Sequence, residues 1–258
     1  MGLTQKMIDD YRMEDGKTIE EAMAVGEYKE GPNDFTSGPR DFSDYHLNSG
    51  VWQMYANREM RFYACVGFNG CYWPASSTTD GSYRLQTVKY CMDGNAGKYA
   101  GTVGSDNYTP TGYVIKKYIS SYDAWRGNSS ERYEKGFPII RYAEILLSYA
   151  EALNQLTTTH AITLPTGESY SLSRDMNEIA KAFNQVRYRA GLPGLTQAQL
   201  ESPTEMFEQI KRERMVEFLG EGRRFYDVRR WGIYEDVDSE PIMGLNIAAN
   251  EFGGFYQR

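Results

Sequence analysis

Three glutamates, Glu213, Glu217 and Glu221, follow one another at intervals of four residues in a segment predicted to be helical. This spacing places their carboxylates on one face of a helix, where paired acids could bind a metal ion or cleave a glycosidic bond. A carboxylate metal site in a helical bundle also needs a histidine three residues after a glutamate, and neither His46 nor His160 stands there. We therefore predict no metal site and no catalytic residues, with a glycoside hydrolase as the less favoured alternative.

Arginines cluster around these acids in the sequence and indicate a structural role. Buried charges persist when an opposite charge pairs with them, and neighbouring arginines would lower the pKa of a carboxyl instead of raising it for general-acid work. The predicted ion network consists of Glu213, Arg214, Glu217, Glu221, Arg224, Asp227 and Arg230. The loop Gly94–Tyr99 lacks the spacing of a phosphate-binding loop, and we predict no cofactor.

Aromatic side chains in turn-rich segments form the second group of residues that could have a function. A flat apolar face beside polar groups suits an amphipathic, planar ligand such as a sugar ring, and loops often carry binding residues. The candidate ligand-binding residues are Trp73, Tyr72, Asn69, Tyr83, Trp125 and Trp52. Core packing is the alternative for each, while the Gly, Asn, Ser and Thr neighbours of Trp73 indicate an exposed loop tip.

Composition narrows the class of protein. The chain has 258 residues, 41% hydrophobic and 24% charged, which is enough for a sizeable core. Its net charge of −7 argues against nucleic acid or an anionic membrane surface as partner. No segment approaches the roughly 18 apolar residues of a membrane span, so we expect a soluble chain. Cys65, Cys71 and Cys91 are an odd number, which leaves one disulfide or three free thiols open.

The sequence changes character near residue 136. Of its 21 tyrosines, 14 precede that point, among many turn-forming residues. We predict a loop-rich aromatic region over residues 1–135, with short strands within 61–68, 84–90 and 113–119, and a helical region over 136–258. The fold class is therefore mainly α, with an irregular region that holds short β-hairpins.

Three helices are predicted after residue 136. Apolar residues recur at three- and four-residue steps over 142–156, and again after the candidate cap Asp175 as far as residue 190. These two segments predict an antiparallel helical hairpin. A third helix should begin at Pro203, with Ser202 as its cap.

Three ordered blocks resemble the SusD/RagB family of cell-surface nutrient-binding proteins. They are PIIRYAEILLSYAEA at 138–152, AFNQVRYRAGLP at 182–193 and ERMVEFLGEGRRFYDVRRWG at 213–232. Residues 4–19 and 58–64 are similar to further family segments, with Glu-Met at 59–60 in place of the usual Asp-Pro. The resemblance covers most of the chain and implies a SusD-like fold with a tetratricopeptide-type helical hairpin.

The resemblance also implies a function. It implies non-catalytic binding of oligosaccharide or polysaccharide at the cell surface, for delivery to a TonB-dependent, SusC-like transporter in the outer membrane. A peptide-binding or protein-docking scaffold of the same complex is the alternative. Because family members are longer and lipid-anchored, we expect a compact carboxy-terminal domain, truncated at both ends, whose membrane anchor lies outside this chain.

Overall fold

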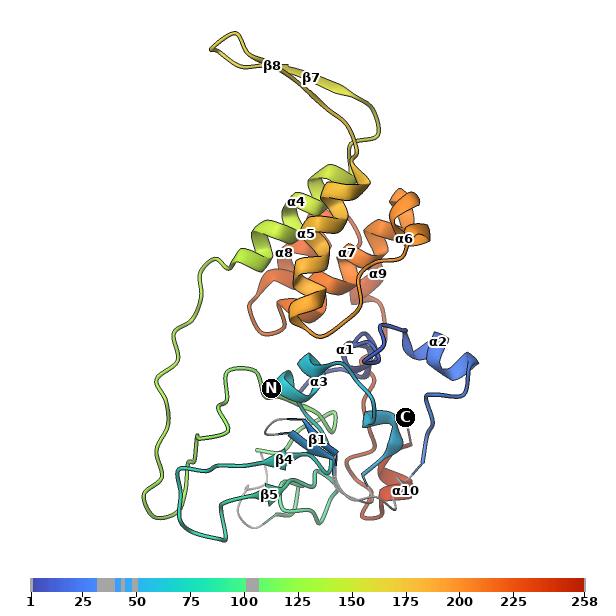
Figure 1. The fold of residues 1–258 in the computed structure, drawn as a ribbon. Helices are drawn as coiled ribbons and strands as arrows, with labels where there is room; N and C mark the ends of the chain where they lie inside the picture. The colour runs from blue at the N-terminus through green and yellow to red at the C-terminus, as the bar shows by residue number, and fades with distance from the viewer. Residues whose placement is uncertain (1, 32–39, 43–44, 48–50, 101–106, 258) are drawn as a thin grey trace. The chain divides into compact units, whose positions relative to one another are not determined.

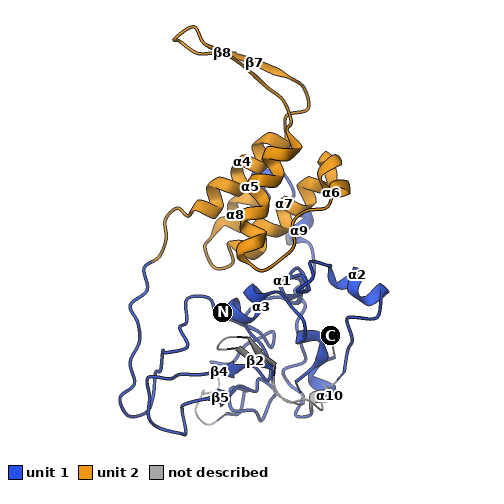
Figure 2. Ribbon diagram, in the orientation of Figure 1, with its two compact units in different colours: residues 1–136, 228–258 blue, residues 137–227 orange. Residues whose placement is uncertain are grey.

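The computed structural model describes residues 2–31, 40–42, 45–47, 51–100 and 107–257 (Figure 1). The chain forms two compact units (Figure 2): unit 1 comprises residues 1–136 and 228–258, and unit 2 comprises residues 137–227. Helices dominate the regular structure, and the strands form short two-stranded antiparallel sheets. The predicted fold class is confirmed.

Unit 2 is built from helices. They are α4 (Tyr142–Asn154), α5 (Met176–Arg189), α6 (Gln197–Glu201), α7 (Pro203–Glu217) and, as far as Asp227, α8 (Arg223–Arg230). The predicted caps are in place: Oδ1 of Asp175 accepts from the backbone N–H of Asn177 at 2.8 Å, and the Ser202 hydroxyl accepts from that of Glu205 at 3.2 Å. The three predicted helices are confirmed as α4, α5 and α7.

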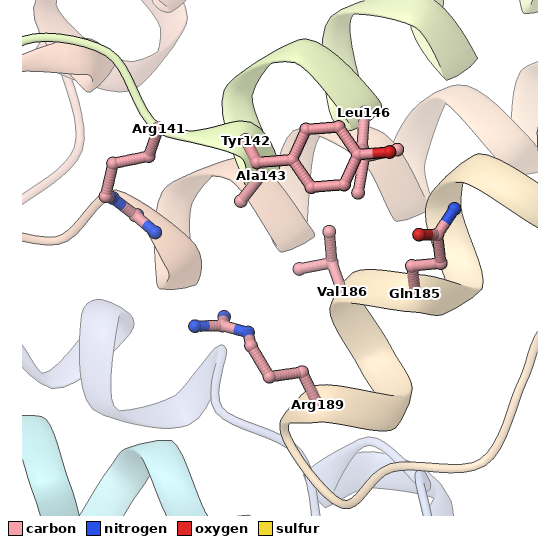
Figure 3. A pocket seen from close by; sticks show the side chains of 7 residues that line it. All are labelled: Arg141, Tyr142, Ala143, Leu146, Gln185, Val186 and Arg189. Carbon is pink, nitrogen blue, oxygen red and sulfur yellow. The ribbon is translucent and has the colours of Figure 1, made fainter.

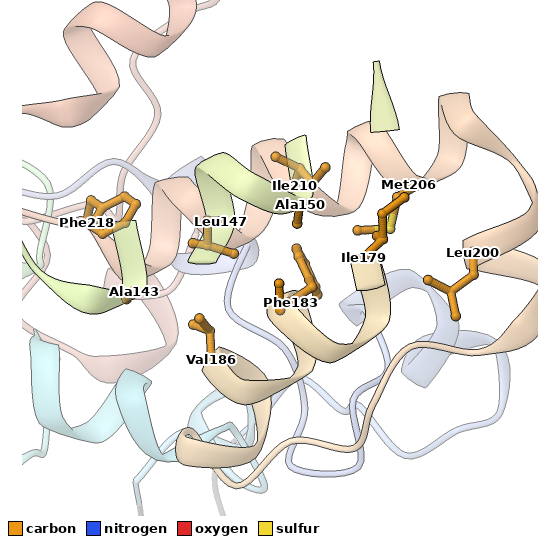
Figure 4. Packing of buried hydrophobic residues seen from close by; sticks show 11 residues of the cluster. Ala143, Leu147, Ala150, Ile179, Phe183, Val186, Leu200, Met206, Ile210 and Phe218 are labelled. Carbon is orange, nitrogen blue, oxygen red and sulfur yellow. The ribbon is translucent and has the colours of Figure 1, made fainter. Parts of the chain in front are cut away.

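Buried side chains from α4, α5 and α7 form the core of unit 2 (Figure 4). They are Ala143, Leu147 and Ala150 of α4, Ile179, Ala182, Phe183 and Val186 of α5, with Leu200, Met206, Ile210 and Phe218. On α4 and α5 these residues recur at three- and four-residue steps, which places them on one face of each helix. Burial of that face holds the antiparallel pair together.

A hairpin that the sequence analysis missed joins α4 to α5. Its strands are β7 (His160–Thr163) and β8 (Ser169–Leu172), paired antiparallel with Ile162 opposite Tyr170. All eight strand residues are exposed, and the hairpin extends away from the helices of unit 2 (Figure 1). The sequence signal is short, because Tyr170 and Leu172 alternate with serines over only four residues and no buried face extends the pattern.

Unit 1 contains only short elements. Its helices are α1 (Gln5–Asp9), α2 (Ile19–Ala24), the 3₁₀ turn η1 (Gln53–Tyr55), α3 (Met60–Cys65), α9 (Tyr234–Asp238) and α10 (Phe252–Phe255). Its paired strands are β1 (Arg40–Phe42) with β2 (Tyr45–Leu47), β3 (Val66–Gly67) with β6 (Val114–Ile115), and β4 (Tyr72–Trp73) with β5 (Gln86–Thr87).

The strand predicted within residues 61–68 is wrong. Residues 61–68 are mostly helical, because α3 occupies residues 60–65 and only Val66–Gly67 is extended. The helical turn buries Phe62 completely, with its ring centroid 5.2 Å from that of Phe68. Tertiary packing here overrides the β-propensity of aromatic residues.

The other two predicted strands are present but short. Within 84–90 only Gln86–Thr87 is paired, and within 113–119 only Val114–Ile115. Left-handed backbone at Leu85 (φ 56°) and Tyr118 (φ 72°) turns the chain out of the extended conformation.

A fully buried arginine anchors the amino-terminal segment in the core of unit 1. The Arg58 guanidinium donates to the carbonyls of Ile8 and Tyr11 at 2.5 and 2.7 Å, and to that of Met54 at 3.2 Å. It also lies 4.8 Å from the ring centroid of Phe62. Arg58 therefore connects the end of α1, through backbone carbonyls, to the aromatic core around Phe62.

Cys65, Cys71 and Cys91 are all buried free thiols. Within the described part of the chain, every helix is too short or too polar to cross a membrane.

Candidate functional site

Three of the predicted ligand-binding residues line one hollow on unit 1. Trp73, Tyr83 and Trp125 surround a volume of about 230 Å³. The side chain of Trp125 is 55% exposed, and Tyr83 is also exposed, whereas Trp73 is half-buried. The remaining lining residues are Ala75, Asp123, Ala124 and Arg126. The hollow thus presents aromatic surface to solvent beside two charged groups.

Cys71 and Lys116 hold the side chain of Trp73 in place. It lies on β4 opposite Gln86 of β5, and its indole Nε1 donates to the sulfur of Cys71 at 3.2 Å. Burial raises the pKa of the Cys71 thiol, which therefore stays neutral and can act as acceptor. The ammonium of Lys116 lies 5.3 Å from the Trp73 ring centroid and donates to the carbonyl of Tyr72 at 3.1 Å. The orientation of the indole is set before any ligand arrives.

Tyr83 and Trp125 belong to two loops that lie side by side, the first after β4 and the second around residues 120–133. The backbone N–H groups of Ser76 and Ser77 in the first loop donate to the carbonyls of Ser121 (2.9 Å) and Tyr122 (3.0 Å) in the second. These two hydrogen bonds hold the loops side by side. The hollow therefore depends on contacts between segments more than forty residues apart.

A glycine allows the two loops to approach closely. Gly127 has a φ of +93°, and a Cβ atom there would lie 2.3 Å from Oγ1 of Thr78 and 3.2 Å from Cδ2 of Tyr83. The Thr78 hydroxyl donates to the carbonyl of Asn128 at 2.9 Å. Both the backbone angle and the available space require glycine at this position.

Asp123 holds the second loop in shape. Its carboxylate accepts from the backbone N–H groups of Ser120 (2.9 Å) and Tyr133 (2.8 Å), and from the ammonium of Lys135. Burial acts to raise the pKa of Asp123, but these hydrogen bonds outweigh it and the pKa is lowered. The Asp123 carboxylate therefore stays charged, and its hydrogen bonds are made within its own loop.

The other three candidates lie elsewhere. Asn69 is buried, where its Oδ1 accepts from the N–H of Tyr90 at 2.7 Å and its Nδ2 donates to the hydroxyl of Tyr256 at 2.9 Å. Trp52 stacks on Tyr256 with ring centroids 4.1 Å apart, and Tyr72 is half-buried on β4. These residues do not line the hollow with Trp73, and their part in ligand binding stays a prediction.

Unit 2 contains a separate cluster of buried ion pairs. Glu217 and Glu221 both pair with Arg141, whose Nη1 lies 2.8 Å from Oε1 of Glu217 and whose Nη2 lies 2.8 Å from Oε1 of Glu221. Burial acts to lower the pKa of Arg141, but the hydrogen bonds with Glu221 and Glu217 outweigh it and raise the pKa. Arg189 pairs with the other oxygen of Glu217. These contacts join α4, α5 and α7.

A second pair is bidentate. Nε and Nη2 of Arg214 each lie 2.9 Å from one carboxylate oxygen of Asp227, and Nη1 donates to the hydroxyl of Ser148 at 3.2 Å. The guanidinium carbons of Arg214 and Arg141 are each 5.2 Å from the ring centroid of Phe218. One aromatic ring therefore links the two groups of ion pairs.

The remaining network residues have other surroundings. Glu213 is buried on α7, and Arg224 and Arg230 lie on α8, where the guanidinium of Arg230 is 4.7 Å from the ring centroid of Trp231. Their membership of the network stays a prediction. Sequence analysis missed Arg141 and Arg189 as partners, because 76 residues separate Arg141 from Glu217. Across the described ranges, no three His, Cys, Asp or Glu side chains gather where a metal ion could bind.

A third feature is a groove between α4 and α5. A hollow of about 270 Å³ lies between these helices, and Figure 3 shows the side chains of both that line it. A hollow of about 240 Å³ continues from it and shares Tyr142, Leu146 and Gln185. On α4 the groove is flanked by an apolar stripe that is well exposed, with Tyr142 at 69%, Ile145 at 55% and Tyr149 at 46%.

Comparison with known proteins gives one family. The SusD family (SusD_RagB) matches residues 1–258. A SusD-like protein from Bacteroides fragilis is 29% identical over 90% of this chain and 36% of its own, with a TM-score of 0.59. The search of curated proteins found no match.

Two further solved structures share the fold. The protein BT4246 is 22% identical over 100% of this chain and 39% of its own, with a TM-score of 0.69. A SusD-like carbohydrate binding protein from Bacteroides fragilis is 21% identical over 99% of this chain and 44% of its own, with a TM-score of 0.59. The chain thus spans between 36% and 44% of the length of these three structures.

Proposed function

Because the chain belongs to the SusD family, we propose that it binds oligosaccharide or polysaccharide without cleaving it, for delivery to a TonB-dependent transporter of the outer membrane. The intact protein then acts at the cell surface. One structural relative is named as a carbohydrate binding protein. The observation that carries the proposal is the hollow in which Trp73, Tyr83 and Trp125 meet.

The shape of the hollow suits part of a long ligand. At about 230 Å³ it is smaller than the roughly 300–1,000 Å³ of pockets that enclose a small molecule. Exposed aromatic rings offer flat apolar surface to the faces of sugar rings, and Trp73 is already held in one orientation. A few sugar units of a polysaccharide that lies across the surface would fit this arrangement.

The charged groups favour binding over hydrolysis. Glycosidases commonly use two carboxyl groups about 5–9.5 Å apart, one of which has a raised pKa. Among the described residues that line the hollow, Asp123 is the single acid. Its pKa is lowered and its oxygens are bound by loop donors, so it is poorly suited to donate a proton.

Affinity electrophoresis tests the proposal. The full chain is run through native gels that contain a panel of polysaccharides, beside Trp125→Ala and the control Tyr170→Ala, which removes an exposed aromatic ring from the hairpin of unit 2. We expect at least one polymer to retard the chain, and Trp125→Ala to weaken that binding about tenfold through loss of stacking. Unchanged retardation of Trp125→Ala would contradict the site, and retardation by none of the polymers would contradict the function.

The groove on unit 2 favours a second candidate, a protein-docking scaffold of the same transporter complex. Exposed apolar stripes of this kind mark interaction surfaces. Ile145→Ser would remove the centre of the stripe and should reduce co-purification with the transporter while leaving glycan retardation unchanged. Loss of transporter binding in Trp125→Ala, with Ile145→Ser unaffected, would count against this candidate.

A further inference from the structure

A pair of stacked tyrosines lies on the same loop as Trp125. The rings of Tyr122 and Tyr133 have centroids 4.7 Å apart and planes inclined by 26°. Tyr122 covers one face of the Tyr133 ring, yet Tyr133 is 59% exposed, so much of its remaining surface faces solvent. Resting on the proposed function, we infer that Tyr133 is a second glycan subsite, on which one sugar unit of a polysaccharide stacks while neighbouring units occupy the hollow.

The tyrosine pair adjoins the hollow through the backbone. Asp123 and Ala124, which line the hollow, directly follow Tyr122 in the chain. Trp125 is three positions after Tyr122, so their Cα atoms are at most about 11 Å apart. Tyr133 is joined to the same stretch, because its N–H donates to Oδ1 of Asp123 at 2.8 Å. One polysaccharide chain that leaves the hollow beside Trp125 therefore has only a short distance to cover before it meets Tyr133.

Both rings are held in place before a ligand binds. The Tyr122 hydroxyl donates to the carboxylate of Glu131, and the N–H of Glu131 donates to the hydroxyl of Ser77 at 3.1 Å. The ammonium of Lys135 donates to the carbonyl of Tyr133 at 2.7 Å and lies 5.9 Å from its ring centroid. A side chain that is already ordered loses little conformational entropy when a sugar stacks on it, which favours binding.

The length of the ligand separates a subsite from a purely structural pair. Tyrosines that only stiffen their loop would affect ligands of every length through the hollow, whereas a subsite affects only ligands long enough to reach it. In multi-unit binding, each further contact adds to the affinity of a ligand that the first site already holds. The dependence of affinity on length therefore tests the role of Tyr133.

Titration calorimetry of the full chain would use size-fractionated hydrolysates, from disaccharide to octasaccharide. They would be prepared from the polymer that retards the chain most strongly in a gel panel of starch, xylan, pectin, galactomannan and laminarin. The variants are Tyr133→Ala, Tyr133→Phe and Trp125→Ala. The control is Tyr170→Ala, which removes an exposed tyrosine ring from the hairpin of unit 2.

We expect the affinity of the unmodified chain to rise with ligand length. Tyr133→Ala should weaken binding of the octasaccharide about tenfold, through loss of stacking, and leave the shortest oligosaccharide that binds unaffected. Tyr133→Phe should keep the affinity at every length, because it preserves the ring. Trp125→Ala should weaken short and long ligands alike, and Tyr170→Ala should weaken neither.

Three results would overturn the inference, and they differ in what they leave. If Tyr133→Ala binds every oligosaccharide as the unmodified chain does, the subsite is wrong and the proposed function stands. If Tyr133→Ala weakens all lengths equally, the tyrosine pair acts by shaping the loop of the hollow, and the proposed function again stands. If no polymer of the panel retards the unmodified chain, the proposed function fails and the inference fails with it. Circular dichroism of Tyr133→Ala would check that the exposed substitution leaves the fold unchanged.

Discussion

Units 1 and 2 both bury carboxylates, but to different effect. In unit 2, Glu217 joins three regular helices through Arg141 and Arg189, and the helices themselves are specified by periodic apolar residues. In unit 1, Asp123 shapes an irregular loop by accepting hydrogen bonds from the backbone N–H groups of Ser120 and Tyr133. The ion pairs of unit 2 thus connect helices, whereas the buried acid of unit 1 shapes a loop that lines the hollow.

Removal of the central acid of unit 2 should have the largest effect on stability. Glu217→Ala would leave Arg141 and Arg189 without their shared carboxylate, and we expect unfolding to become easier by about 3–5 kcal/mol. Urea denaturation measures the change. The exposed pair of Glu178 and Lys181 provides the control, since Glu178→Ala should cost no more than about 0.5 kcal/mol. Equal midpoints for the two variants would contradict a structural role for Glu217.

Substitution of one glycine in each unit should have effects of intermediate size on stability. Gly127→Ala would introduce both backbone strain and a clash with Thr78, at a cost of about 1–3 kcal/mol, and should disturb the hollow. Gly167 has a similar φ of +88° but open space around it, so Gly167→Ala should cost about 1 kcal/mol and leave ligand binding intact. Thermal unfolding and glycan retardation would be measured together. A Gly127→Ala protein that binds normally would show that the close loop approach is not needed.

Acid should act on unit 1 through Asp123. A carboxyl whose pKa is lowered by folding contributes stability above its unfolded pKa of about 3.9, and that contribution is lost as the pH falls through the folded value. We therefore expect the indole N–H signal of Trp125 to move toward a disordered position below about pH 4. In Asp123→Asn this pH dependence should disappear, and an unchanged titration would exclude Asp123 as its cause.

The smallest effect on stability is expected at the exposed stripe of α4. Ile145→Asp places a charge where the side chain is already 55% exposed, so the melting temperature should change by only about 1 °C or less. Association with a docking partner should nevertheless be lost. A large drop in melting temperature would show that Ile145 belongs to the core of unit 2.

The sequence predicted unit 2 far better than unit 1, for a physical reason. Helices α4, α5 and α7 carry their signals locally, in apolar spacing and in the caps Asp175 and Ser202. In unit 1 the residues of α3 have high β-propensity, but the burial of Phe62 among other rings favours a helical turn. Local patterns fail where distant contacts decide the conformation.

The candidate site shows the same limit. Trp73, Tyr83 and Trp125 could be selected by residue type and neighbouring turns, but Asn69 and Trp52 share those features and pack elsewhere. Arg126 joins the hollow only because two distant loops pair through their backbones. No spacing in the sequence carries that information.

If the hollow on unit 1 holds the glycan, the indole N–H signals of the tryptophans will report its binding. The chain has four tryptophans, Trp52, Trp73, Trp125 and Trp231, each with one such signal in a ¹⁵N-resolved spectrum. On titration with the polysaccharide that retards the chain, the signals of Trp73 and Trp125 should shift while those of Trp52 and Trp231 stay in place. Shifts confined to Trp52 or Trp231, or no shift at saturation, would contradict glycan binding at the hollow.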